Sequence, residues 1–130
     1  MIKGGCYCGK IGFEVDGDIR PIIYCHCGQC RKMSGHYMAA SAAQTTELTI
    51  AGDVTWFQSS ATAQRGFCAT CGTHLFWRMD GEVHTSIEAG AFDEGTKLFA
   101  HKHIYVEAKA DYYEINDGLP QYIGYEELVK

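Results

Sequence analysis

Seven cysteines are the side chains in this sequence best suited to chemistry, and their spacing divides them into three groups. The groups are Cys6 with Cys8, Cys25 with Cys27 and Cys30, and Cys68 with Cys71. In a reducing compartment, clustered thiols are typically metal ligands or catalytic groups, and an odd number cannot all pair as disulfides. The clustering therefore predicts that the chain binds zinc through thiolates.

The first and last groups together supply the four ligands of a closed zinc site. Cys68 and Cys71 have the spacing of a metal knuckle, and Gly72 after them permits a tight backbone. Cys6 and Cys8 lie two residues apart, so an extended segment places both side chains on one face. Four thiolates, each about 2.3 Å from the ion, complete a tetrahedral structural Zn²⁺. Such a site joins distant segments and thereby stabilises a small β domain.

The middle group offers three thiolates, from Cys25, Cys27 and Cys30, with the imidazole of His26 between the first two. Three protein ligands and one vacant position are typical of a reactive zinc centre, where water or a substrate thiol completes the tetrahedron. A thiol bound there loses its proton, so the site can present a nucleophilic thiolate near neutral pH. This reactive interpretation makes the three cysteines candidate catalytic residues.

Two alternatives fit the same spacing. In one, His26 or the more distant His36 is the fourth ligand of a second structural zinc. In the other, two C-x-x-C knuckles pair as they do in a zinc ribbon, and the ligands of one ion are Cys27, Cys30, Cys68 and Cys71. Spacing alone leaves all of these arrangements open.

Strands are the elements expected to position these thiols. Apolar and polar residues alternate in four segments, and alternation with a period of two is typical of half-buried strands. The alternating segments are residues 11–15, 48–50, 75–79 and 83–89, and further β-rich runs cover residues 54–58 and 65–67. The predicted fold class is therefore mainly β.

Few signals indicate turns and helices. Asp80-Gly81 lies between two of the alternating segments and predicts a two-residue hairpin turn, in which glycine accepts positive φ. One helical turn is expected over residues 31–35, and a short terminal helix over residues 122–129. The sequence thus predicts little helix.

Length and charge restrict the architecture and the partners. A chain of 130 residues fits one domain, and we expect residues 1–130 to form it. The formal net charge of -5 disfavours nucleic-acid phosphates and anionic membranes as partners. Residues 1–6 lack the apolar core of a signal peptide, and no segment has the length and apolar character of a membrane span, so we expect a cytoplasmic protein. No motif specifies an oligomeric state.

Ordered motifs over nearly the whole chain carry a resemblance to a known family. They include Gly5-Cys6-Tyr7-Cys8-Gly9, Cys25-His26-Cys27-Gly28-Gln29-Cys30, Arg65-Gly66-Phe67-Cys68-Ala69-Thr70-Cys71-Gly72, Gly90-Ala91-Phe92-Asp93, His103-Ile104 and Asp117-Gly118-Leu119-Pro120. On these motifs the chain resembles the glutathione-dependent formaldehyde-activating enzyme family, to which the zinc-binding region of centromere protein V also belongs.

The resemblance implies a fold, two metal sites and an activity. The implied fold is a β-tent of antiparallel sheets pinned by a structural zinc. The implied ligands of this zinc are Cys6, Cys8, Cys68 and Cys71. A second, labile zinc at the active site is implied for Cys25, Cys27 and Cys30. The implied activity is that of a carbon–sulfur lyase, in which glutathione thiolate adds to formaldehyde and gives S-hydroxymethylglutathione. The expected partner is therefore a small-molecule thiol such as glutathione.

Substrate and function class remain open at this point. The enzyme that names the family is longer, and the sequence shows no recognisable set of residues that binds the glutathione backbone. One alternative function is a non-catalytic zinc module that binds a protein partner. Another is a thiol oxidoreductase that uses a C-x-x-C thiol of depressed pKa.

Four further residues near the motifs have two interpretations each. Arg31 and Arg65 lie beside the cysteine groups and can neutralise thiolate charge or bind a substrate carboxylate, but surface ion pairs are the common role of arginine. His103 in a β-rich segment is expected to be a hydrogen-bonded packing residue more often than a catalytic one. Asp93 is expected in a turn or cap.

Overall fold

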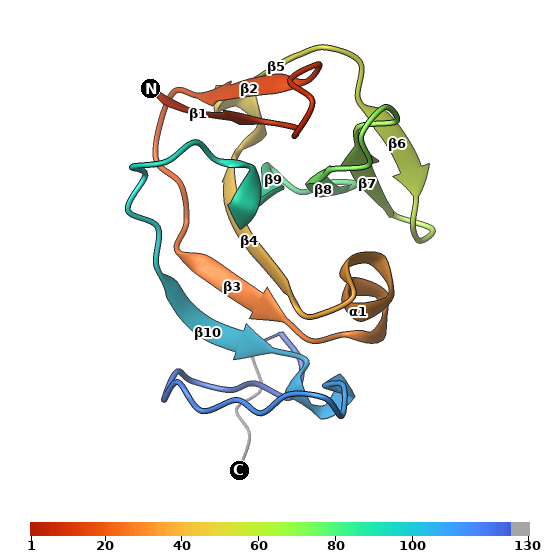
Figure 1. The fold of residues 1–130 in the computed structure, drawn as a ribbon, viewed down its shortest axis with the longest axis vertical. Coiled ribbons are helices and arrows are strands. Elements are labelled where there is room, and N and C mark those ends of the chain that lie inside the picture. Colours follow the sequence, from red (N-terminus) through yellow and green to blue (C-terminus); the bar gives the residue numbers. More distant parts are fainter. Residues whose placement is uncertain (126–130) are drawn as a thin grey trace. The chain divides into compact units, whose positions relative to one another are not determined.

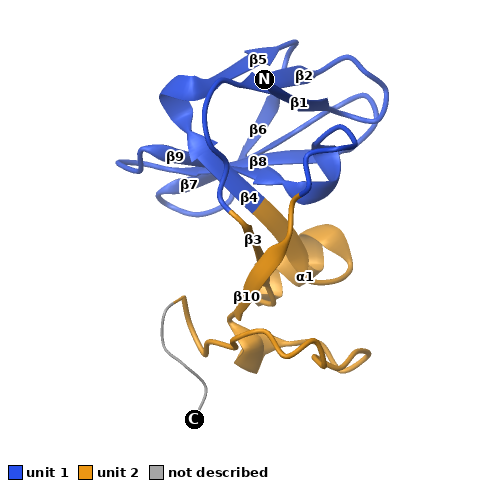
Figure 2. Cartoon of the chain, turned by 90° about the vertical axis from the view of Figure 1, so that its left-hand side faces the viewer, with its two compact units in different colours: residues 1–20, 41–97 blue, residues 21–40, 98–130 orange. Residues whose placement is uncertain are grey.

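The computed structural model describes residues 1–125, and within it the chain divides into two compact units. Unit 1 comprises residues 1–20 and 41–97, and unit 2 comprises residues 21–40 and those from 98 onward (Figure 2). Both units are discontinuous in sequence, so each is assembled from segments that lie far apart along the chain. The expectation that residues 1–130 form one domain stays a prediction.

One sheet of unit 1 has three antiparallel strands in the order β1-β2-β5. These strands are β1 (Ile2–Gly5), β2 (Gly12–Val15) and β5 (Leu48–Ala51). Phe13 and Val15 on β2 are buried while the residues between them are half-buried, as the alternation in the sequence predicts. One face of β2 therefore packs in the core of unit 1.

The other strands of unit 1 follow the order β4-β9-β8-β7-β6, and the β9–β8, β8–β7 and β7–β6 pairs are antiparallel. Their bounds are β4 (Met38–Gln44), β6 (Thr55–Gln58), β7 (Ala63–Phe67), β8 (His74–Met79) and β9 (His84–Glu88). Strand β4 is shared, because its first three residues belong to unit 2. Strand β7 leads directly into Cys68, so the sheet fixes the start of the loop that carries Cys68 and Cys71.

The turn between β8 and β9 is longer than the predicted two-residue turn. Gly81 has a φ of 80°, as expected, and the Glu82 N–H donates to the Met79 carbonyl at 3.1 Å. Strand β9 begins only at His84, however, so four residues connect the strands. In this connection the Val83 carbonyl accepts a hydrogen bond from the Thr45 N–H at 2.9 Å, just after the end of β4.

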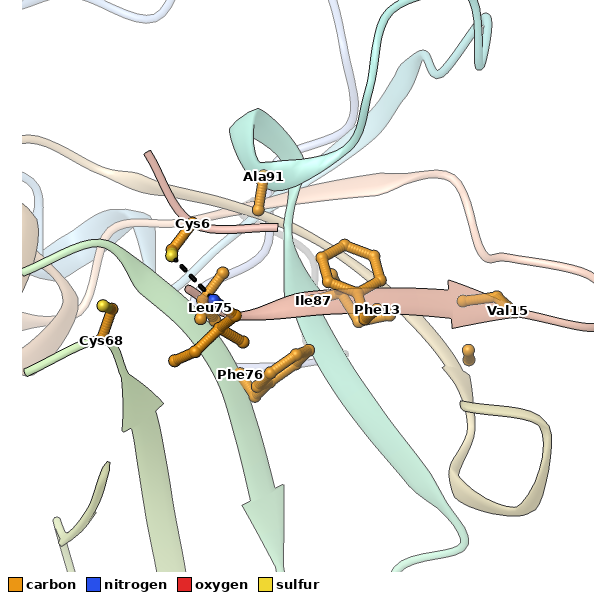
Figure 3. Packing of buried hydrophobic residues seen from close by; sticks show 10 residues of the cluster. Cys6, Phe13, Val15, Cys68, Leu75, Phe76, Ile87 and Ala91 are labelled. Atoms are coloured by element: carbon orange, nitrogen blue, oxygen red, sulfur yellow. Dashed lines mark hydrogen bonds between the residues drawn. The ribbon is translucent and has the colours of Figure 1, made fainter. Parts of the chain in front are cut away.

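The hydrophobic core of unit 1 includes two of the predicted zinc ligands (Figure 3). Leu75 and Ile87 are fully buried, and the rings of Phe13 and Phe76 meet edge to face at 5.5 Å. Burying a side chain of this size contributes roughly 1.5–3 kcal/mol. The buried members of the cluster are Cys6, Ile11, Phe13, Val15, Ala43, Cys68, Leu75, Phe76, Ile87 and Ala91.

Unit 2 is built on β3 (Ile22–Cys25), which lies between β10 (Ala100–Ile104) and the start of β4. β10 runs parallel to β3, while β4 is antiparallel to it. Helix α1 (Gly28–Ser34) follows β3 directly (Figure 1). It begins three residues before the predicted helical turn, because Cys27 acts as its N-cap, and it ends at Gly35 in the left-handed conformation.

The remaining helical elements are three short 3₁₀ turns: η1 (Thr45–Glu47), η2 (Ala89–Ala91) and η3 (Val106–Ala108). The predicted class, mainly β with little helix, is confirmed, although β10 and β3 form a parallel pair. Of the predicted terminal helix, residues 122–125 form a bridge and a bend, and residues 126–129 lie outside the described residues. Within residues 1–125, no helix is both long and apolar enough to cross a membrane.

Candidate metal centres

The thiols of unit 1 converge on a single point. The Sγ atoms of Cys6, Cys8, Cys68 and Cys71, here called the four-cysteine cluster, all lie within 4.8 Å of one another. The separation is 3.6 Å between Cys6 and Cys8, and 3.7 Å between Cys8 and Cys68. A tetrahedral zinc with bonds of about 2.3 Å places its sulfurs about 3.8 Å apart. The donor type, number and spacing therefore fit a tetrahedral zinc.

Two backbone loops shape this cluster. In the loop after Cys6, the Ile11 N–H donates to the Cys6 Sγ at 3.2 Å (Figure 3), and Gly9 takes a φ of 82°. In the loop after Cys68, the Cys68 N–H donates to the Thr73 carbonyl at 3.0 Å, and Gly72 takes a φ of 79°. Glycine accepts such positive φ values without strain. The two loops therefore direct their thiols toward one point, where a single ion can bind all four.

The electrostatics of the cluster favour a thiolate at Cys71 but not at Cys8. At Cys8 the Lys10 backbone hydrogen bond is outweighed by desolvation and by the neighbouring thiols, which raise the pKa of Cys8 to about 11. Hydrogen bonding by the Thr73 side chain, 3.1 Å from the Cys71 Sγ, and by the Thr73 backbone lowers the pKa of Cys71 to about 5. Cys6 and Cys68 are buried in the core, while Cys8 is exposed. A metal bound here would therefore connect the first loop to the β7–β8 turn at the edge of the core.

The thiols of unit 2 form the second group. The Sγ atoms of Cys25, Cys27 and Cys30, here called the three-cysteine cluster, also lie within 4.8 Å of one another. Cys25 ends β3, Cys27 caps α1, and Cys30 lies in the first turn of that helix. The Cys30 N–H donates to the Cys27 Sγ at 3.3 Å, and hydrogen bonds from the side chains of Cys25 and Cys30 lower the pKa of Cys27. A strand end, a turn and a helix start together place three sulfurs.

The structure provides no fourth protein ligand for the three-cysteine cluster among residues 1–125. His26 is fully buried, with its Nδ1 2.6 Å from the Tyr113 hydroxyl and its Nε2 2.8 Å from the His103 Nδ1, so both of its nitrogens are engaged elsewhere. His36 packs its ring on Tyr37 at 4.2 Å. The thiols thus group as the resemblance implies, with Cys27 and Cys30 beside Cys25 and not in a ribbon with Cys68 and Cys71.

His26 belongs to a chain of hydrogen-bonded side chains that spacing does not predict. Its partner His103 places Nε2 2.8 Å from the Asp117 Oδ2, so the chain runs Asp117, His103, His26, Tyr113. The expectation that His103 is a hydrogen-bonded residue is met, but its partners lie 77 and 14 residues away in sequence. Apart from the inclusion of His26, His103 and Asp117 in family motifs, no signal in the sequence marks this chain.

The surroundings of the chain set the direction of its hydrogen bonds. Burial lowers the pKa of His26 to about 4, so its ring is neutral at pH 7. The Leu119 N–H lowers the pKa of Asp117, whose carboxylate then accepts from the His103 Nε2. When His103 carries one proton, its Nδ1 accepts from the His26 Nε2. The His26 Nδ1 then accepts from the Tyr113 hydroxyl, whose pKa is raised by burial.

The remaining candidate residues have other surroundings. Arg31 is exposed on α1, whereas Arg65 on β7 is only 4% exposed, which excludes the surface role considered for it. Burial raises the pKa of Glu88 to about 8, against the attraction of the Arg65 guanidinium. Asp93 immediately precedes the turn at residues 94–95, and its backbone N–H donates to the Lys3 carbonyl of β1 at 2.9 Å.

A depression of about 450 Å³ lies on the three-stranded sheet of unit 1. Its lining includes Lys3, Glu14 and Asp93 but none of the seven cysteines and no histidine. The Lys3 Nζ and Glu14 Oε1 atoms lie 3.5 Å apart there. The depression therefore contributes no thiolate or imidazole and is not part of either cysteine cluster.

Comparisons with known proteins agree with this geometry. The chain is 28% identical over 114 residues to an uncharacterized lyase of Schizosaccharomyces pombe, covering 86% of this chain and 83% of that protein. A crystal structure of a Rhodobacter sphaeroides protein has the same fold, with a TM-score of 0.58 and 24% identity over 73% of this chain and 91% of the other. Residues 1–108 match the family described as glutathione-dependent formaldehyde-activating enzyme, and the chain therefore belongs to that family.

Proposed function

We propose that this protein is a zinc-dependent carbon–sulfur lyase that acts on the adduct of a thiol and an aldehyde, such as S-hydroxymethylglutathione. The observation that carries the proposal is the three-cysteine cluster, whose three convergent thiols have no fourth protein ligand among residues 1–125. Membership of the family and the lyase name of the yeast relative support the reaction class. The four-cysteine cluster is proposed to hold a structural zinc.

The proposed reaction is an addition without redox change. In the synthetic direction, the thiol sulfur forms a bond to the aldehyde carbon, the carbonyl π electrons move to oxygen, and the thiol proton ends on that oxygen. When bound, zinc supplies positive charge that favours the thiolate and polarises the carbonyl. Cys25, Cys27 and Cys30 would hold that ion and would leave one position for a reactant. Together they fix the point at which the carbon–sulfur bond forms.

Side chains beside α1 offer contacts to a reactant. The Tyr112 hydroxyl donates to the Gly35 carbonyl at 2.9 Å and thereby joins the end of α1 to the segment after η3. His36 packs on Tyr37 and Tyr113, at centroid distances of 4.2 and 4.5 Å. This aromatic surface lies next to α1, which carries Cys30, and offers apolar contact to the carbon chain of a thiol. Arg31 on the same helix offers a donor to a carboxylate.

The test measures the exchange between free glutathione, formaldehyde and their adduct by nuclear magnetic resonance at equilibrium. The zinc-loaded chain is expected to accelerate that exchange, and Cys27→Ser is expected to abolish the acceleration while the fold is kept. Other small thiols, assayed in parallel, identify the preferred substrate. If the loaded chain accelerates the exchange with none of them, the proposal is wrong.

The oxidoreductase alternative gains support from one observation, the closeness of three sulfurs that include a C-x-x-C pair. It predicts that oxidation converts Cys27 and Cys30 to a disulfide that a thiol substrate reduces, in a cycle that requires no metal. The lyase requires the metal and involves no disulfide. Activity of the metal-free chain with a disulfide substrate would therefore favour the alternative.

A further inference from the structure

The chain Asp117, His103, His26, Tyr113 lies entirely within unit 2, where the three-cysteine cluster also lies. Its three contacts are 2.8, 2.8 and 2.6 Å long. Every ring nitrogen of the two histidines therefore has a partner. Neither ring can rotate about its Cβ–Cγ bond without breaking two hydrogen bonds in a buried place, where each lost partner is costly.

Packing restricts the two rings further. His26 and His103 are 0% and 2% exposed, and their ring centroids are 5.0 Å apart. Tyr37 packs on His26 at 4.8 Å, and Tyr24 packs on His103 at 5.0 Å. The two ends of the chain are less buried, since the Asp117 side chain is 41% exposed and Tyr113 is half-buried. The two histidines are therefore the buried part of the network, and Asp117 is its most exposed member.

His26 connects this network to the thiols, because it separates Cys25 from Cys27 in sequence. Its backbone N–H donates to the Ile104 carbonyl at 3.0 Å, next to His103 on β10. Cys25 itself pairs with Ile104 in the parallel β3–β10 ladder. The backbone between two of the three sulfurs is therefore held to β10 by one main-chain bond and, through the His26 ring, by the network.

We propose that Asp117 and His103 are positioning residues for the three-cysteine cluster and act on it through His26. In this role they fix the direction in which Cys25 and Cys27 present their sulfurs. Groups outside the ligand shell that orient ligands in this way typically change metal affinity when they are replaced. The inference rests on the proposed function in one respect, since that function assigns a metal to this cluster.

The test uses the full chain loaded with Co²⁺, whose absorption reports thiolate coordination geometry. Cys25→Ser retains only the four-cysteine spectrum, so subtraction gives the spectrum of the three-cysteine cluster. Asp117→Ala and His103→Gln are expected to weaken Co²⁺ binding at the three-cysteine cluster about 10–100-fold and to change its absorption. The affinity of the four-cysteine cluster should stay unchanged, which also shows that the fold is intact.

Two further variants separate positioning from charge. Asp117→Asn keeps an oxygen that accepts from His103, so it should weaken binding less than Asp117→Ala does. Asp111→Asn removes an exposed carboxylate from the same segment and should change neither site. If loss of charge alone were responsible, Asp117→Asn would match Asp117→Ala and the positioning role would be wrong.

Other results would also overturn the inference. Wild-type affinity and absorption at the three-cysteine cluster in both Asp117→Ala and His103→Gln would exclude a positioning role. Equal weakening of both clusters would mean that the variants act on the fold as a whole. A wild-type chain that binds Co²⁺ at the four-cysteine cluster alone would instead contradict the proposed function. Co²⁺ binding by the wild-type chain is therefore measured first, before the Asp117 and His103 variants are compared.

Discussion

Replacement of Cys71 by serine tests whether the four-cysteine cluster holds the fold of unit 1 together. Cys71 is half-buried, so the substitution removes a ligand with little loss of packing, and Ser can keep a hydrogen bond to Thr73. The cluster joins Cys8 to Cys68, 60 residues apart. Closing a loop of that length in the unfolded chain corresponds to about 4 kcal/mol by the chain-entropy relation used for covalent cross-links. The loss of metal–thiolate bonding adds to this.

That loss is a large part of the stability of a typical domain, which is about 5–15 kcal/mol. A loss of 4 kcal/mol lowers Tm by at least about 10 °C for domains near this size. The assay is thermal unfolding followed by circular dichroism, with bound zinc counted in the same samples. Cys25→Ser is the matched control, because Cys25 is also half-buried but belongs to the other cluster. It should lose one zinc and keep its Tm. An unchanged Tm in Cys71→Ser, or an equal fall in Cys25→Ser, would refute the reasoning.

Two further predictions concern unit 1. The pKa of Glu88 rises from 4.5 to about 8 on folding, so the folded state holds an extra proton between these values and loses stability as pH rises through that window. Glu88→Gln should therefore raise the free energy of unfolding by about 3 kcal/mol at pH 7, and by little near pH 4.5. Denaturant titrations of the variant and the wild type at both pH values measure this difference. An equal gain at both pH values would contradict the burial of this carboxyl. Gly52 has a φ of 99°, and a Cβ there would overlap the Lys10 carbonyl oxygen, so Gly52→Ala should cost roughly 1–3 kcal/mol. Gly90→Ala, where a Cβ meets no atom within 4 Å, is its control, and equal stability of the two variants would show that the close approach is absent.

The strands that could be predicted from the sequence are those with one buried face. Phe13 and Val15 on β2, like Thr85 and Ile87 on β9, alternate with more exposed residues, and this alternation indicates a strand without knowledge of the fold. Strand β4 has no such signal, because its small residues Ser41, Ala42 and Ala43 are buried in succession. β10 was not predicted either, since two histidines and a lysine dominate it and its burial depends on tertiary partners.

The thiols could be grouped from the sequence because ligand number and family motifs restrict them to a few partitions. Spacing alone did not decide whether a histidine completes the three-cysteine cluster, since that depends on where the His26 ring points. That direction is set by His103 and Tyr113, which lie 77 and 87 residues further along the chain. The burial of Arg65 could not be predicted for the same reason, because it follows from the packing of β7 and not from the proximity of Arg65 to a cysteine in the sequence.

We expect the four-cysteine cluster to hold the fold and the three-cysteine cluster to hold an exchangeable metal. The decisive experiment is a stepwise titration of the zinc-loaded chain with a weak chelator, in which released zinc and circular dichroism are followed together. Four thiolates close a tetrahedron, whereas three leave one position open to a competing ligand. The first equivalent of zinc should therefore leave without unfolding and should be missing from Cys25→Ser, Cys27→Ser and Cys30→Ser. Unfolding with the first equivalent, or two equivalents retained by these variants, would contradict this expectation.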